Sequence, residues 1–324
     1  GSVAGMEWTA DVAAGAWLAD RLDDPWSGTV HDVVPRGFAA YARVLHPASR
    51  DRPVGRPWPP LPYATHRAAW EAFEASDPRI EEERVGWAAV AAAFGTRLHP
   101  TSAWQDLVAP GVVVPGEDGP RDADGWRYQE PPLGQLEAPT LAALARRLVE
   151  HTSTPDDGHL AVWEGWGGLL GHTGPTPSRA FLQAGDDVRH RRLLSNLVPE
   201  RFRSPWARDR WQPGILPDEV SRGPRLELPH RGHVLFAAGV AELTSPDWVL
   251  RAPWRDREAE THGFPPAALS PSLVWPRDRA WVLVSEVDWD STVVGGSAEL
   301  VAALVADPEV EALPLPADAR LTGD

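Results

Sequence analysis

Apolar residues recur at helical spacing in several stretches of the chain and predict six helices. Thr140 and Ser297 stand where an N-cap residue is expected, and Gly95 stands where a left-handed C-cap is expected. The helix that begins at Thr140 places Leu141, Leu144 and Leu148 on one face. The predicted helices span residues 8–22, 65–75, 85–94, 102–108, 140–150 and 297–306.

Shorter apolar runs, bounded by glycine, proline or charged residues, predict strands. The run 281–287 is the strongest of them, and the sequence Pro-His-Arg-Gly at 229–232 favours a hairpin between its two neighbours. A further strand begins at His159 and ends in glycines. The other predicted strands span 38–46, 226–228, 233–238 and 310–315.

Long stretches rich in proline separate these elements, above all 53–62 and 110–139. Helices and strands alternate without a steady strand–helix–strand rhythm. The pattern therefore predicts the α+β class, with mixed or antiparallel sheets packed with helices and joined by long Pro-rich loops. We expect one globular domain over 1–324, with a possible subdivision near 151–158 between a mostly helical part, 8–150, and a strand-rich part, 159–324.

Composition narrows the possible chemistry. The chain has no cysteine, and all 31 basic residues are arginines. Disulfides, thiolate metal sites, cysteine nucleophiles, Schiff-base lysines and a Walker lysine are therefore excluded. No stretch approaches the roughly 18 apolar residues of a membrane span, and no basic-then-apolar leader opens the sequence. We expect a cytoplasmic protein with no membrane contact.

The formal net charge of -15 makes nucleic acid an unlikely partner. The charge is uneven, because 281–324 holds nine acidic residues and one arginine, whereas 189–210 holds seven arginines and two acidic residues. The acidic excess could steer a basic protein partner. An RNA-binding arm at 189–210 is an alternative.

The stretch 281–297 carries the most distinctive chemistry. Glu286, Asp288 and Asp290 follow an apolar run at every second position, so a continuous strand would place all three carboxylates on one face. Neighbouring carboxylates repel one another unless a cation, an arginine or water compensates their charge. A Gly-Gly turn and a helix capped by Ser297 are expected to follow.

Two interpretations of these carboxylates stay open. In the first, Asp288 and Asp290 bind a divalent cation (Mg²⁺, Mn²⁺ or Ca²⁺) and Glu286 is the base of a metal-dependent hydrolase. In the second, the carboxylates face solvent or pair with Arg231, Arg277 or Arg279.

The 17 tryptophans are mostly expected in the core, but some lie beside predicted strands together with polar residues. Aromatic platforms next to acids suit sugars, and aromatic boxes suit quaternary ammonium groups. The candidate binding residues are Trp163, Glu164, Trp166, His230, His233 and Trp289.

Five motifs in fixed order resemble those of a family of uncharacterised actinobacterial proteins. They lie at 34–47, 87–100, 162–167, 270–276 and 295–297 and would cover most of the chain. The family has no assigned activity, so the resemblance implies a bacterial, cytoplasmic protein and transfers no catalytic residues. From the residues themselves, we expect a non-catalytic protein that binds a protein or a small ligand, in an immunity-like or regulatory role. A metal-dependent hydrolase is the alternative.

Overall fold

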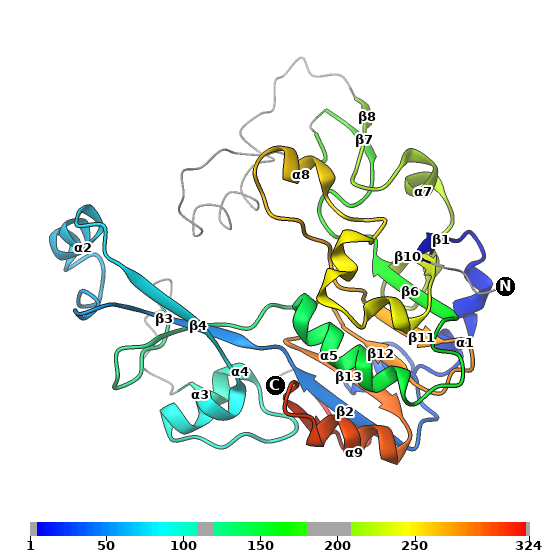
Figure 1. Ribbon diagram of the computed structural model, residues 1–324, viewed down its shortest axis with the longest axis horizontal. Helices are drawn as coiled ribbons and strands as arrows, with labels where there is room; N and C mark the ends of the chain where they lie inside the picture. Colours follow the sequence, from blue (N-terminus) through cyan, green and yellow to red (C-terminus); the bar gives the residue numbers. More distant parts are fainter. Residues whose placement is uncertain (1–4, 109–118, 176, 180–208, 322–324) are drawn as a thin grey trace. The chain divides into compact units, whose positions relative to one another are not determined.

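The computed structural model describes residues 5–108, 119–175, 177–179 and 209–321 (Figure 1). Its contacts divide the chain into two compact units. Both units combine helices with antiparallel strands, which confirms the predicted α+β class. The first unit comprises Gly1–Pro25, Pro35–Gly37 and Glu137–Leu283, and the second comprises Trp26–Val34, Phe38–Leu136 and Val284–Asp324.

The first unit contains a sheet with the strand order β1-β10-β6-β11-β12, in which β9 also pairs with β10. The predicted hairpin is confirmed, because Gly232 lies opposite Glu227. The predicted strand at 159 is confirmed as β6, whose central residues are fully buried. The strands are β1 (Glu7–Trp8), β6 (Gly158–Trp163), β9 (Leu226–Glu227), β10 (Gly232–Ala237), β11 (Leu273–Pro276) and β12 (Val282–Val284), with a separate pair β7 (His172–Gly174) and β8 (Arg210–Gln212).

The main helix of the first unit is α5 (Ala138–Val149); its N-cap is Glu137, so the predicted N-cap at Thr140 is wrong. Its predicted apolar face is buried, because Leu141, Leu144 and Leu148 are all nearly inaccessible. The indole of Trp281 donates a hydrogen bond of 3.0 Å to the carbonyl of Leu148. The other helical segments are η1 (Val12–Gly15), α1 (Ala16–Ala19), α7 (Asp218–Arg222), η3 (Val240–Leu243), η4 (Pro246–Leu250) and α8 (Arg257–Thr261).

The long helix predicted over 8–22 is only partly correct. Trp8 belongs to a strand, and the helical part is split into a 3₁₀ segment and the short α1. Gly15 lies at the break, and a Cβ atom there would come within 2.7 Å of the Leu226 side chain. Close packing of this backbone against β9 therefore favours glycine over a better helix former.

The second unit has β2 (Ala40–Leu45) between β13 (Ser291–Gly296) and β14 (Ala312–Pro314), all antiparallel. Helix α9 (Ala298–Ala306) packs on these three strands. The hydroxyl of Ser297 accepts a hydrogen bond of 3.1 Å from the Leu300 amide, so the predicted N-cap is confirmed. The remaining helical segments are η2 (Val30–Asp32), α2 (Arg67–Ala75), α3 (Trp87–Phe94) and α4 (Trp104–Leu107).

A three-stranded sheet of the second unit was not predicted from the sequence. Its order is β4 (Ile80–Val85), β3 (Ala48–Pro53), β5 (Arg127–Gln129), and β3 and β4 form a long ribbon that leads to α2 (Figure 1). Residues of opposite charge face each other across the ribbon, where Arg50 lies opposite Glu83 and Arg52 opposite Glu81. Strands of this kind depend on cross-strand pairs and lack an apolar pattern.

The other face of β3 carries a buried ion pair. Nε and Nη2 of Arg127 donate to the two carboxylate oxygens of Asp51 at 2.8 and 2.7 Å. The guanidinium also lies 3.9 Å from the ring centroid of Trp58. A bidentate pair stacked on an indole fixes β5 against β3.

Residues 8–150 were predicted to be mostly helical, but they contain the four strands β2 to β5. The loop at 151–158 lies inside the first unit.

Among the described residues, no helix has the length and apolar character that a membrane crossing requires.

The Asp51→Asn substitution is predicted to lower the free energy of unfolding by about 3 kcal/mol or more, because it removes the carboxylate charge that pairs with the buried guanidinium of Arg127. The two side chains are only 4% and 9% exposed. Denaturant unfolding measures the loss. Glu83→Gln is the control, since Glu83 is about half exposed and its pair with Arg50 is worth less than about 1 kcal/mol. Equal losses in the two variants would contradict the prediction.

Candidate functional site

The acidic stretch does not form the predicted strand face. Strand β12 ends at Val284 and β13 begins at Ser291, so the three carboxylates lie in the connection between them. The Trp289 amide donates to the Glu286 carbonyl at 3.0 Å and closes a turn there. Because a turn interrupts the alternation, the expectation that the three carboxylates share one strand face is wrong.

Asp290 forms an ion pair with Arg43, an arginine that was not among the candidates predicted from the sequence. Nη2 of Arg43, on β2, lies 3.0 Å from Oδ1 of Asp290. The Arg43 side chain is only 1% exposed, and burial lowers its pKa while Asp290 raises it. The guanidinium also donates to the Ser291 hydroxyl and to the carbonyls of Pro100 and Ser102.

The arginine pair bears on the predicted metal site. In the described ranges, no group of three or more His, Asp or Glu side chains is placed to hold a metal ion. One carboxylate oxygen of Asp290 accepts a hydrogen bond from Arg43. Burial raises the pKa of Asp290, and the charge of Arg43 partly offsets this by lowering it. Metal ligation by Asp288 and Asp290, with Glu286 as the base, stays a prediction that this geometry does not favour.

Beside this pair, a row of hydrogen bonds runs through the His46 side chain. Nδ1 of His46 donates to the Pro132 carbonyl at 2.7 Å, because a carbonyl can only accept. Nε2 must then accept from the Thr292 hydroxyl at 2.9 Å, and Thr292 in turn accepts from Ser285 at 2.5 Å. All three polar side chains are buried, so the chain holds strands together and offers no accessible nucleophile.

Five of the six predicted binding residues come together in the first unit. His233 on β10 lies opposite Trp163 on β6, and the rings of Trp163 and Trp166 meet edge to face at 5.3 Å. Glu164 follows β6, and His230 precedes β10. The sixth residue, Trp289, belongs to the second unit.

Contacts inside the first unit account for most of this aromatic group. Glu164 pairs with Arg225 at 3.1 Å, and the guanidinium of Arg231 lies 4.9 Å from the Trp163 ring centroid. His233 is buried, which lowers its pKa to about 4. These contacts involve Trp163, Glu164 and His233, and ligand binding by the group stays a prediction.

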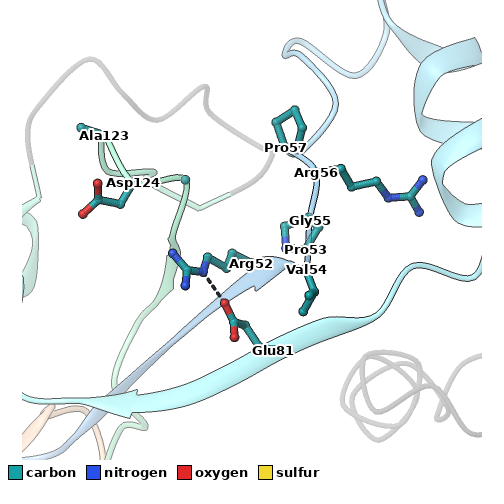
Figure 2. Close-up of a pocket in the computed structure, with 10 residues that line it drawn as sticks. Arg52, Pro53, Val54, Gly55, Arg56, Pro57, Glu81, Ala123 and Asp124 are labelled. Atoms are coloured by element: carbon teal, nitrogen blue, oxygen red, sulfur yellow. Dashed lines mark hydrogen bonds and ion pairs between the residues drawn. The ribbon is translucent and has the colours of Figure 1, made fainter.

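A pocket of about 580 Å³ lies at the far end of β3, in the segment that the sequence showed only as a Pro-rich loop. Figure 2 shows Arg52 and Glu81 between the segment 53–57 and a turn that carries Asp124. Its volume falls in the range of small-molecule sites. The lining residues are Arg52, Pro53, Val54, Gly55, Arg56, Pro57, Glu81, Ala123, Asp124 and Gly125.

The guanidinium of Arg52 is held in place from two sides. Its Nε pairs with Oε1 of Glu81, and its Cζ lies 4.2 Å from the ring centroid of Trp126. Its Nη1 and Nη2 have no hydrogen-bond partner in the part of the chain that the structure describes. A positioned guanidinium with two available nitrogens is the usual recognition element for a planar anion.

The turn that carries Asp124 is organised by Asp122. Oδ1 of Asp122 accepts from the amides of Asp124 and Trp126 at 2.9 and 3.0 Å. Its Oδ2 accepts from the Tyr128 hydroxyl at 2.8 Å. Gly125 has φ +80°, a conformation that favours glycine. The Asp124 carboxylate itself has no hydrogen-bond partner within the described segments.

On the other side of the pocket, Arg56 extends toward α2 (Figure 2). Its Cζ lies 4.6 Å from the ring centroid of Phe73, and its Nη2 donates to the Ser76 hydroxyl. Arg56 therefore forms a wall of the pocket while its terminal group is occupied.

The arginine-rich segment predicted as an RNA-binding arm, 189–210, lies outside the described residues except for its last two positions.

Acid is predicted to destabilise both units through their buried histidines. The pKa of His46 is lowered to about 4 by burial, and that of His233 likewise, whereas an unfolded histidine titrates near 6.5. The unfolded state therefore binds more protons between these values. The free energy of unfolding should fall from pH 6.5 toward pH 4, by at most about 1.4 kcal/mol per pH unit for each histidine.

Denaturant unfolding at several pH values measures this slope. The His46→Gln variant removes one of the two protons, so its slope in the same window should be smaller than that of the wild type. An unchanged slope would show that the His46 pKa is not depressed.

Comparison with known proteins identifies no relative, since the chain matches no family model, no curated protein and no solved structure. The resemblance to an actinobacterial family therefore stays a prediction from its motifs. Among the described residues, the pocket beside Arg52 brings charged side chains of both signs together around an open volume.

Proposed function

We propose that this protein is a non-catalytic binding protein and that it takes a small polar ligand in the pocket beside Arg52. The proposal rests on one observation, the position and the hydrogen bonding of the Arg52 guanidinium. Trp126 and Glu81 hold it in position, yet Nη1 and Nη2 have no partner among the described residues. A preorganised donor pair binds a ligand with less loss of side-chain entropy than a free arginine would.

The wall around Arg52 supports the same function. Asp51 and Arg127 tie β3 to β5 on the opposite face, and Asp122 closes the turn that carries Asp124. These contacts fix the strand and the turn that line the pocket. Its volume lies within the range of small-molecule sites.

The alternatives have less support. A basic protein partner would follow from the net charge of -15, which acts through steering and specifies no contact. The metal-dependent hydrolase has less support because Asp290 pairs with Arg43, and no other observation favours a reaction there.

Thermal unfolding with a panel of amino acids, dicarboxylates, nucleotides and monosaccharides tests the proposal. At least one class should stabilise the wild type, by about 2.7 kcal/mol at a concentration of about 100 times Kd. Arg52→Gln should lose this stabilisation. Because the Arg52–Glu81 pair is partly exposed, we expect the variant to fold with a small change in stability.

Arg251→Gln is the matched control. Arg251 forms a similar exposed pair with Glu242 in the first unit and does not line the pocket, so the ligand should still stabilise this variant. A panel without any effect, or equal stabilisation of the wild type and Arg52→Gln, would refute small-ligand binding at this site.

A further inference from the structure

The polar groups of the pocket carry both signs of charge. Arg52 offers two available nitrogens as donors, and Glu81 uses only Oε1 in its pair with Arg52. The second oxygen of Glu81 and both oxygens of Asp124 are therefore acceptors without a partner among the described side chains. Figure 2 shows Arg52 lying between Glu81 and the turn that carries Asp124.

From this arrangement we infer that the ligand is a zwitterion that carries a carboxylate and an ammonium group, such as a free amino acid or a short peptide. The inference rests on the proposed function of the same pocket. The ligand carboxylate would accept from Nη1 and Nη2 of Arg52, and the ammonium group would donate to the Asp124 carboxylate.

Charge complementarity excludes simpler ligands. An anion alone would pair with Arg52 but would be repelled by the carboxylates of Glu81 and Asp124. A cation alone would be repelled by the guanidinium group of Arg52. A neutral sugar would leave the charge of Asp124 without a counter-charge among the described residues. Only a ligand with both charges satisfies donors and acceptors together.

The walls allow room beyond the two charged groups. The pocket encloses about 580 Å³, and its remaining surface comes from Pro53, Val54 and Pro57 and from the turn glycines Gly55 and Gly125. This surface is mostly aliphatic or backbone and suits the chain of a peptide, whose amide groups can bond to exposed backbone.

Calorimetric titration with triglycine and its two blocked forms tests the inference. Triglycine has both charges, N-acetyl-triglycine has only the carboxylate, and triglycine amide has only the ammonium group. Triglycine should bind the wild type, and each blocked form should bind about tenfold or more weakly, because each loses one charge-assisted contact. Arg52→Gln and Asp124→Asn should weaken triglycine binding, whereas Arg251→Gln should not.

The outcomes separate the inference from the proposed function. If N-acetyl-triglycine or a dicarboxylate binds as well as triglycine and Arg52→Gln abolishes the binding, the pocket is an anion site. The proposed function then stands and the zwitterion inference fails. If triglycine binds the wild type and Arg52→Gln equally, the ligand lies elsewhere and the inference fails. If neither triglycine nor any member of the panel binds, both fail.

Discussion

Burial of arginine side chains is the constraint on which the second unit depends. Removing a guanidinium from water costs several kcal/mol unless carboxylates and carbonyls replace the lost hydration. Arg43 meets this demand with Asp290, Ser291 and two loop carbonyls, and Arg127 meets it with Asp51 and the ring of Trp58. The two arginines thereby fix the loop at 100–102 and strand β5.

The same constraint explains the fate of the acidic stretch. Alternation along 281–290 implied a strand with three carboxylates on one face, but the chain turns at Glu286–Trp289 and β13 returns beside β2. Asp290 then lies next to the buried charge of Arg43 and becomes its counter-ion. The stretch whose pattern suggests a metal site is, in the fold, a connection that supplies this counter-ion and leaves Asp288 exposed.

Local signals in the sequence predicted local structure well. Ser297, Gly95 and the leucines of α5 specify caps and a buried face through contacts within one or two helical turns. The β3–β4 ribbon could not be predicted in this way, because Arg52 and Glu81 are stabilised by each other across the strands and show no apolar period. The pocket could not be predicted either, because its walls come from 52–57, 81 and 123–125, which the pairing of the ribbon with β5 brings together.

The position of Trp126 links the two sides of the pocket mechanically. Its indole supports the guanidinium of Arg52, and its backbone amide closes the turn that presents Asp124. The donor and the acceptor sides of the pocket are therefore anchored to one residue, and a displacement of one side would be passed to the other through a single rigid ring. If the pocket binds a zwitterion as proposed, this shared anchor would make it select ligands by the distance between their two charged groups.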